Sequence, residues 1–131
     1  MKILIVDDDQ VNRSFLCKSL SAYGQCINED DGKKAIGSFV KALYDQEPFD
    51  LVLLDIMMPN IDGQEALRIL RKIEEQWKVK PGKEAKVIMV TALHSPMEVT
   101  RAFFQGEATD YVVKPVIIEE LKNKIDALFK K

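Results

Sequence analysis

Cysteine is scarce in this 131-residue chain, which carries only Cys17 and Cys26. Small secreted domains depend on several disulfides, and two isolated cysteines beside apolar residues do not form such a framework. We therefore expect two free, buried thiols and a reducing, cytoplasmic environment. Histidine is scarcer still: the single His94 is expected at the surface, because the sequence shows no partner for a metal or proton-transfer role.

The chain also has little net charge, since 19 Lys and Arg residues against 21 Asp and Glu residues leave a formal charge of −2. A protein that binds the nucleic-acid backbone usually presents a basic field, so we expect no direct contact with nucleic acid. The basic segment at residues 78–86 contains Pro81-Gly82, which favours a solvated loop over a docking patch for an acidic partner.

Long apolar runs are missing as well. The first run, residues 3–6, meets three aspartates at once, so it is too short for a signal peptide, and no later segment approaches the length of a membrane span. We expect a soluble protein without membrane contact. With 131 residues and 47% hydrophobic composition, one domain over residues 1–131 can bury a core without disulfides.

Short apolar runs alternate with amphipathic segments along the chain. Runs typical of strands cover residues 3–6, 26–29, 51–54, 87–90 and 111–113. Apolar residues at helical spacing cover residues 11–20, 35–43, 66–77, 96–106 and 121–129. Five strands alternating with five helices predict an α/β fold with one doubly wound parallel sheet. The alternation does not fix the strand order, but the flavodoxin-like order 2-1-3-4-5 places the first and third strands side by side.

Polar residues follow the apolar runs directly. Asp55 closes residues 51–54, where it could start a turn or serve chemistry at a strand's carboxyl end; that stretch alone leaves the two alternatives even. Helix capping explains one or two of the aspartates at residues 7–9. Right-handed crossovers place every strand's carboxyl end at one edge. In the flavodoxin-like order, the side chains that converge there are Asp7, Asp8, Asp55, Thr91 and Lys114.

This set of side chains suits phosphoryl transfer. Clustered carboxylates repel one another, and a hard divalent ion such as Mg²⁺ relieves the repulsion while leaving room for phosphate oxygens. Asp55 can act as a nucleophile that forms an aspartyl phosphate. Lys114 supplies a positive charge for one phosphoryl oxygen, and the Thr91 hydroxyl can donate to another.

With these residues the chain resembles the receiver (CheY-like) domain of two-component response regulators over residues 2–128. The matching motifs are Asp7-Asp8 in ILIVDDD, Asp55 in LVLLDIMMP with Gly63 behind it, Thr91 in VIMVTA, and Tyr111 and Lys114-Pro115 in DYVVKP. The resemblance implies that Asp55 takes a phosphoryl group from a phosphohistidine on a histidine kinase or a histidine phosphotransfer protein.

The same resemblance implies a magnesium site and a conformational switch. Asp8 and Asp55 would ligate Mg²⁺ directly, Asp7 largely through water, and Met57 through its backbone carbonyl. The Lys114-Pro115 bond would be cis, as such bonds can be before proline. Phosphorylation would draw the Thr91 hydroxyl toward the phosphoryl group and turn the Tyr111 ring inward.

The surface that changes would be the fourth helix, the fifth strand and the fifth helix. We expect a downstream protein target or output domain to read residues 96–105, Tyr111 and residues 117–128, and a homodimer through helices four and five stays open. Residues 106–111 look one residue longer than usual, so the start of the fifth strand is uncertain. The helix before Gln46 and the basic loop also look long for a minimal receiver.

The resemblance also implies that the positions two residues after Asp55 and two after Thr91 flank the path of the hydrolytic water, and these positions are the apolar Met57 and Leu93. We expect them to slow autodephosphorylation. The main interpretation is a signalling module that catalyses its own phosphorylation and dephosphorylation without a separate substrate, either on its own or as part of a longer protein. The alternatives are a small phosphohydrolase with the same aspartyl-phosphate chemistry and a receiver-like scaffold that never accepts phosphate.

Overall fold

The computed structural model describes residues 1–58, 60–91 and 108–130. The elements in chain order are β1 (Lys2–Val6), α1 (Gln10–Ser19), β2 (Gln25–Glu29), α2 (Gly32–Tyr44), β3 (Leu51–Asp55), α3 (Gly63–Gln76), β4 (Lys86–Thr91), β5 (Asp110–Val113) and α5 (Ile118–Leu128). The strands form one parallel sheet in the order β2-β1-β3-β4-β5. This confirms the predicted fold class and strand order.

The helix predicted at residues 96–106, together with Leu93 and His94, lies outside the described residues.

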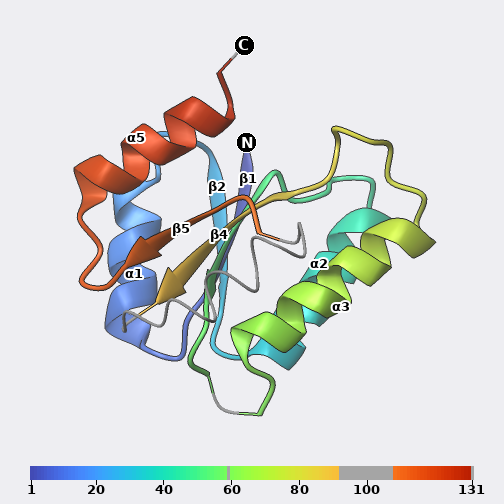
Figure 1. Ribbon diagram of the computed structural model, residues 1–131, viewed down its shortest axis with the longest axis horizontal. Helices are drawn as coiled ribbons and strands as arrows, with labels where there is room; N and C mark the ends of the chain where they lie inside the picture. The colour runs from blue at the N-terminus through green and yellow to red at the C-terminus, as the bar shows by residue number, and fades with distance from the viewer. Residues whose placement is uncertain (59, 92–107, 131) are drawn as a thin grey trace.

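Helices cover both faces of the sheet, with α1 and α5 on one side and α2 and α3 on the other (Figure 1). Successive side chains of a strand point to opposite faces. Accordingly, Ile3 and Ile5 belong to the apolar cluster under α1 and α5, whereas Leu4 and Val6 belong to the cluster under α2 and α3. Burial on both faces explains why the central strands read as unbroken apolar runs in the sequence.

Only part of the apolar face of α1 is buried, although the sequence pattern predicts that the whole face packs against the sheet. Leu16 and Leu20 are buried, as expected, but 75% of Val11 and 49% of Phe15 is exposed. These two residues, four positions apart, form a second stripe on the same helix surface, away from the sheet.

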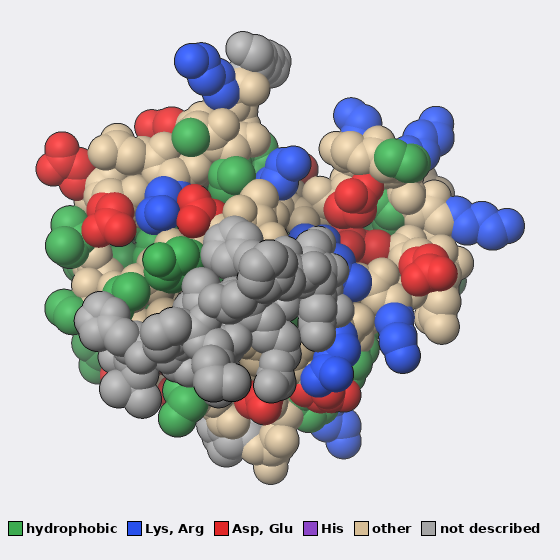
Figure 2. Space-filling view, viewed as in Figure 1, with side chains coloured by type: hydrophobic (Ala, Val, Ile, Leu, Met, Phe, Trp, Pro, Cys, Tyr) green, Lys and Arg blue, Asp and Glu red, His purple; other side chains and the backbone are tan. Residues whose placement is uncertain are grey.

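The segment from α3 to β4 is a mostly exposed loop. An ion pair on α3 holds the end of this loop that precedes β4. Arg71 Nη1 donates to Glu74 Oε1 at 2.6 Å and to the Ala85 carbonyl at 3.0 Å, and the Ala85 N–H donates to Glu74 Oε2 at 2.7 Å. Glu74 is only 4% exposed. Lys and Arg side chains gather over α3 and this loop in Figure 2. The prediction of a solvated basic loop is confirmed. Trp77, the C-cap of α3, is 44% exposed.

Strand β5 begins at Asp110, one residue earlier than the sequence pattern indicated. The Thr109 N–H donates to the Val87 carbonyl, and the Val87 N–H donates to Thr109 Oγ1, which ties the start of β5 to β4. The segment therefore enters the sheet in a fixed register, with Thr91 opposite Val113.

Both cysteines are free, as expected, but half-buried rather than fully buried. Burial, followed by the neighbouring Cys17 thiol, raises the pKa of Cys26 to about 11. Among the described residues, no helix combines the length and apolar character needed to cross a membrane.

Candidate functional site

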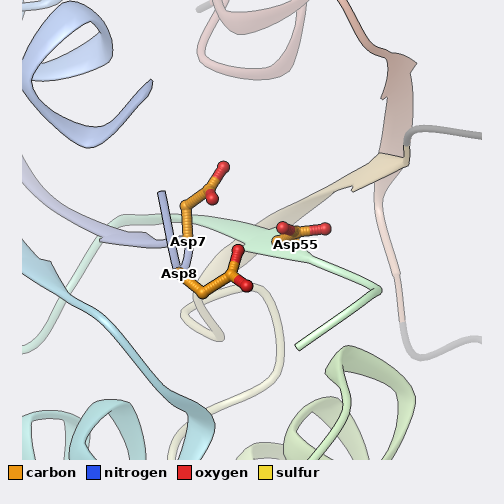
Figure 3. Close-up of side chains that lie close together, drawn as sticks. All are labelled: Asp7, Asp8 and Asp55. Atoms are coloured by element: carbon orange, nitrogen blue, oxygen red, sulfur yellow. The ribbon is translucent and has the colours of Figure 1, made fainter. Parts of the chain in front are cut away.

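Three aspartates meet at the carboxyl ends of β1 and β3. Asp7 and Asp8 follow β1, Asp55 ends β3, and the three side chains lie close together in Figure 3. One carboxylate oxygen from each lies within 4.8 Å of the others. Asp7 is 2% exposed and Asp55 1% exposed, whereas Asp8 is exposed to solvent. The site therefore has two buried acids and one at its mouth.

Sheet pairing and a tight loop produce this meeting of distant residues. Val6 lies opposite Leu54 in the parallel register, so the residues that follow them emerge side by side. After Asp55 the chain folds back, with the Gly63 N–H donating to the Ile56 carbonyl at 2.9 Å. A Cβ on Gly63 would lie 2.3 Å from the Asp55 carbonyl oxygen, so only glycine permits this close approach.

The third aspartate of the acidic run has a structural task. The Asp9 side chain caps α1 by accepting hydrogen bonds from the Val11 and Asn12 backbone N–H groups. The Asp9 N–H in turn donates to Asp7 Oδ1 at 2.9 Å, which fixes the orientation of that carboxylate. The capping explanation thus holds for Asp9, while Asp7 and Asp8 are directed to the site.

Lys114 reaches the buried acids from the end of β5. Its Nζ lies 2.9 Å from Asp55 Oδ2 and 3.2 Å from Asp7 Oδ2, and its side chain is 20% exposed. The Lys114-Pro115 bond is cis, as predicted. The ammonium therefore bridges the two carboxylates, one from β3 and one from beyond β1.

Burial and charge act against each other at this ion pair. Burial raises the pKa of the Asp55 carboxyl, and the Asp7 charge adds to this rise. The Lys114 ammonium and the Met57 N–H lower the pKa, but the net effect is a rise. For Lys114, burial alone would lower the pKa, but the hydrogen bonds and charges of Asp55 and Asp7 outweigh it and raise the pKa. The lysine consequently keeps its positive charge at neutral pH.

The remaining predicted site residues differ in how far they are buried and in how close they lie to the ion pair; they are Thr91, Met57 and Tyr111. Thr91 ends β4, is 2% exposed, and its carbonyl accepts from the Lys114 N–H at 2.7 Å. Met57 is 56% exposed, and its N–H donates to Asp55 Oδ1 at 3.1 Å. Tyr111 lies on β5, opposite Met89, with 38% of the residue exposed. All the predicted site residues therefore lie at this edge except Tyr111, which is further back along β5.

The sequence pattern did not identify Arg13 as part of this region. Its Nη1 donates to the Asp7 carbonyl at 2.7 Å and its Nε to Asn28 Oδ1 at 3.3 Å, so it joins α1 to the ends of β1 and β2. The sequence carries no signal for the first of these contacts, because the partner of Arg13 Nη1 is a backbone carbonyl.

The donor set has the chemistry of a site for a hard divalent cation. Carboxylate oxygens are the ligands that Mg²⁺ prefers, and it is typically held by one or two of them together with phosphate oxygens and water. A groove of about 570 Å³ opens beside the acids, between α1 and residues 114–116, and Asp7, Phe15 and Lys114 are among its lining residues. Of the exposed stripe of Val11 and Phe15 on α1, Phe15 lines this groove.

Comparisons with known proteins agree on one family. The family model "Response regulator receiver domain" matches residues 3–126. The response regulator MprA of Mycolicibacterium vanbaalenii is 34% identical over 132 residues, covering 100% of this chain and 51% of MprA, so the chain spans about half the length of that relative.

Two solved structures have the same fold. The CheX-CheY-BeF3-Mg+2 complex from Borrelia burgdorferi matches with a TM-score of 0.81 and 27% identity, covering 100% of this chain and 90% of the matched one. The co-crystal structure of the Saccharomyces cerevisiae histidine phosphotransfer signaling protein Ypd1 with the receiver domain of Ssk1 matches with a TM-score of 0.79 and 25% identity, covering 96% and 86%. The chain belongs to the receiver domains of response regulators, which are phosphorylated in two-component systems.

Proposed function

We propose that Asp55 is the phosphoacceptor of this receiver domain, which extends over residues 1–131. The observation that carries the proposal is the placement of a buried Asp55 carboxylate 2.9 Å from the Lys114 ammonium, beside two further acids. An Asp55 oxygen attacks the phosphorus atom of a phosphohistidine, the bond from phosphorus to the imidazole nitrogen breaks, and the imidazole leaves with the electron pair. Lys114 then pairs with an oxygen of the transferred group, and the Thr91 hydroxyl donates to another.

Asp8 and Asp55 would hold Mg²⁺ directly, with Asp7 acting largely through water and Met57 contributing its backbone carbonyl. When bound, the ion neutralises charge on the phosphoryl oxygens and on the clustered acids. The fit rests on three carboxylates whose ligand atoms lie within 4.8 Å of one another. The CheX-CheY-BeF3-Mg+2 complex from Borrelia burgdorferi supports the same choice of cation.

The phosphoryl donor would be a histidine kinase or a histidine phosphotransfer protein. The Val11 and Phe15 stripe supports a docking contact there, because it exposes large apolar side chains beside the groove that leads to Asp7 and Lys114. The Ypd1–Ssk1 co-crystal structure is a precedent for a receiver domain bound to a phosphotransfer protein. The apolar stripe would contact the donor protein while its phosphohistidine reaches Asp55.

Phosphorylation would control a second surface, made of residues 96–105, β5 and α5. Thr91 and Tyr111 would carry the change, Thr91 by moving toward the phosphoryl group and Tyr111 by turning inward. The reader of this surface would be a downstream protein target, an output domain or a second copy of the chain. The domain would act as a signalling module that phosphorylates and dephosphorylates itself and has no separate substrate.

Intact-mass measurement after incubation with Mg²⁺ and acetyl phosphate or phosphoramidate tests the acceptor. We expect one phosphate adduct on the wild type, none on an Asp55→Asn variant, and little without Mg²⁺. An Asp45→Asn variant removes an exposed carboxylate at the end of α2 and should still form the adduct. An adduct on Asp55→Asn, or none on a wild type that demonstrably binds Mg²⁺, would contradict the proposal.

A further inference from the structure

Lys124 connects α5 to the residue pair at the start of β5. Its Nζ lies 3.2 Å from Asp110 Oδ1 and 5.7 Å from the centroid of the Tyr111 ring. The same Asp110 oxygen accepts a hydrogen bond from the Tyr111 N–H at 2.8 Å. One ammonium and one carboxylate thus hold both the backbone and the ring of Tyr111, and we refer to Asp110, Tyr111 and Lys124 as the Lys124 cluster.

The helix that carries Lys124 cannot follow the ring if the ring moves. Leu121 and Ile125, the residues three before and one after Lys124, are both 0% exposed in the core under α1 and α5. The lysine stem therefore starts from a backbone fixed by packing. A cation placed over an aromatic face is attracted to it only while the two stay in register.

The Lys124–Asp110 ion pair is better shielded from water than the Lys41–Asp45 pair on the surface. The Lys124 and Asp110 side chains are each 28% exposed, whereas those of Lys41 and Asp45 are 78% and 42% exposed. Fully exposed pairs contribute little, because water screens them and both side chains lose freedom. The Lys124 cluster is therefore able to influence a balance between two positions of the Tyr111 ring.

We propose that Lys124 is a positioning residue that holds the Tyr111 ring on the outer side of β5 and so favours the unphosphorylated arrangement of the domain. The inference rests on the proposed function, in which phosphorylation turns this ring inward. An inward ring leaves the Lys124 ammonium, so the cation–π contact stabilises only the outward position. A contact made in only one state shifts the equilibrium toward that state, and it lowers the affinity for any ligand that prefers the other state.

Binding of beryllium fluoride with Mg²⁺, a phosphoryl mimic, measures this balance at equilibrium. A Lys124→Met variant keeps the apolar stem and loses the ammonium, and we expect its affinity for beryllium fluoride to rise about two- to fivefold. Lys122→Met is the matched control, with the same charge change on the same helix, and should bind as the wild type does. Lys124→Arg keeps a cation at this position and should restore wild-type affinity.

A double-mutant comparison separates positioning from a general charge effect. In a Tyr111→Ala background the Lys124→Met change should have no effect on affinity, because the ring it acts on is gone. Asp110→Asn is a second route to the same result: it removes the ion pair, keeps an acceptor for the Tyr111 N–H, and should also raise affinity. This variant decides the question if Lys124→Met does not fold.

The failures can be told apart. A wild type that forms the Asp55 adduct, together with Lys124→Met and Asp110→Asn variants of unchanged affinity, would overturn the role of Lys124 alone. An equal rise in affinity with Tyr111→Ala present would also overturn it. A wild type that forms no Asp55 adduct would overturn the proposed function, and the role of Lys124 with it.

Discussion

At the scale of single residues, Gly63 sets the shape of the loop behind Asp55. A Cβ there would meet the Asp55 carbonyl oxygen at 2.3 Å, which is a contact with backbone and therefore hard to relieve. We expect Gly63→Ala to lower the free energy of unfolding by about 3 kcal/mol, as overpacking of a close contact does, and to reduce the yield of phosphorylated protein. Urea unfolding and intact mass measure the two effects.

Gly37 provides the control for this change. It lies inside α2 and is exposed, and a Cβ added there would meet no other atom within 4 Å. Because alanine has the better helix propensity, Gly37→Ala should raise the free energy of unfolding by about 0.5 to 1 kcal/mol. If Gly63→Ala were as stable as Gly37→Ala, the close approach would not restrict residue 63.

Met57 and Leu93 are expected to set the lifetime of the phosphorylated state. Met57 is adjacent to the proposed acceptor, because its N–H donates to Asp55 Oδ1, and the residue is 56% exposed. A Met57→Gln or Leu93→Glu variant offers a polar group that can hold the attacking water, so we expect about fivefold faster loss of phosphate, equivalent to one added hydrogen bond. Intact mass over time measures the decay, and equal or slower decay in both variants would contradict the expectation.

At the scale of secondary structure elements, the Arg71–Glu74 pair fixes the junction between α3 and β4. Glu74 satisfies both the Arg71 guanidinium and the Ala85 N–H, and it is 4% exposed. We expect Glu74→Ala to cost about 2 kcal/mol in the free energy of unfolding, because the Ala85 N–H loses its acceptor and Arg71 loses its carboxylate partner. Urea unfolding measures this cost.

The neighbouring Glu75 is an exposed residue on the same helix and is the matched control. Glu75→Ala should change stability by no more than about 0.5 kcal/mol, as most surface substitutions do. Equal losses in the two variants would mean that the pair does not anchor the loop.

The central strands β1, β3 and β4 could be predicted from the sequence because burial on both faces makes them continuous apolar runs. The face of α1 could not. Val11, Phe15, Leu16 and Leu20 all fit a helical repeat, but that repeat covers two adjacent stripes, and only the packing against the sheet decides which is buried. The start of β5 at Asp110 also depended on hydrogen bonds to β4 that the sequence does not reveal.

The candidate site was predictable to the extent that each residue ends a strand. Asp7, Asp55 and Lys114 follow apolar runs, and the parallel sheet brings both carboxylates within 3.2 Å of one ammonium. Arg13 could not be assigned in the same way, because its partner is the backbone carbonyl of Asp7 and no side-chain pattern marks such a contact. Contacts to backbone depend on the final positions of α1 and β1.

At the scale of the whole molecule, the acid cluster should make stability depend on Mg²⁺. Three neighbouring carboxylates repel one another in the unliganded domain, and a cation that binds only the folded chain stabilises it. At a concentration of about one hundred times its Kd, Mg²⁺ should add about 2.7 kcal/mol to the free energy of unfolding. Thermal melts with and without EDTA measure the effect.

Asp8 is the variant of choice because it is exposed and can be changed without disturbing the core. Asp8→Asn should lose most of the dependence on Mg²⁺, whereas Glu75→Gln, with the same change of charge far from the site, should keep it. A dependence that survived in Asp8→Asn would place the cation elsewhere.

The site draws on strand ends at Asp7, Asp55, Thr91 and Lys114, so no short stretch of the chain contains it. During synthesis on the ribosome, a nascent chain that has not yet reached Lys114 has its acids but lacks the ammonium that bridges them. The geometry proposed to receive a phosphoryl group thus exists only once β5 has been made and has joined the sheet. We therefore expect only fully synthesised and folded copies of the domain to accept a phosphoryl group.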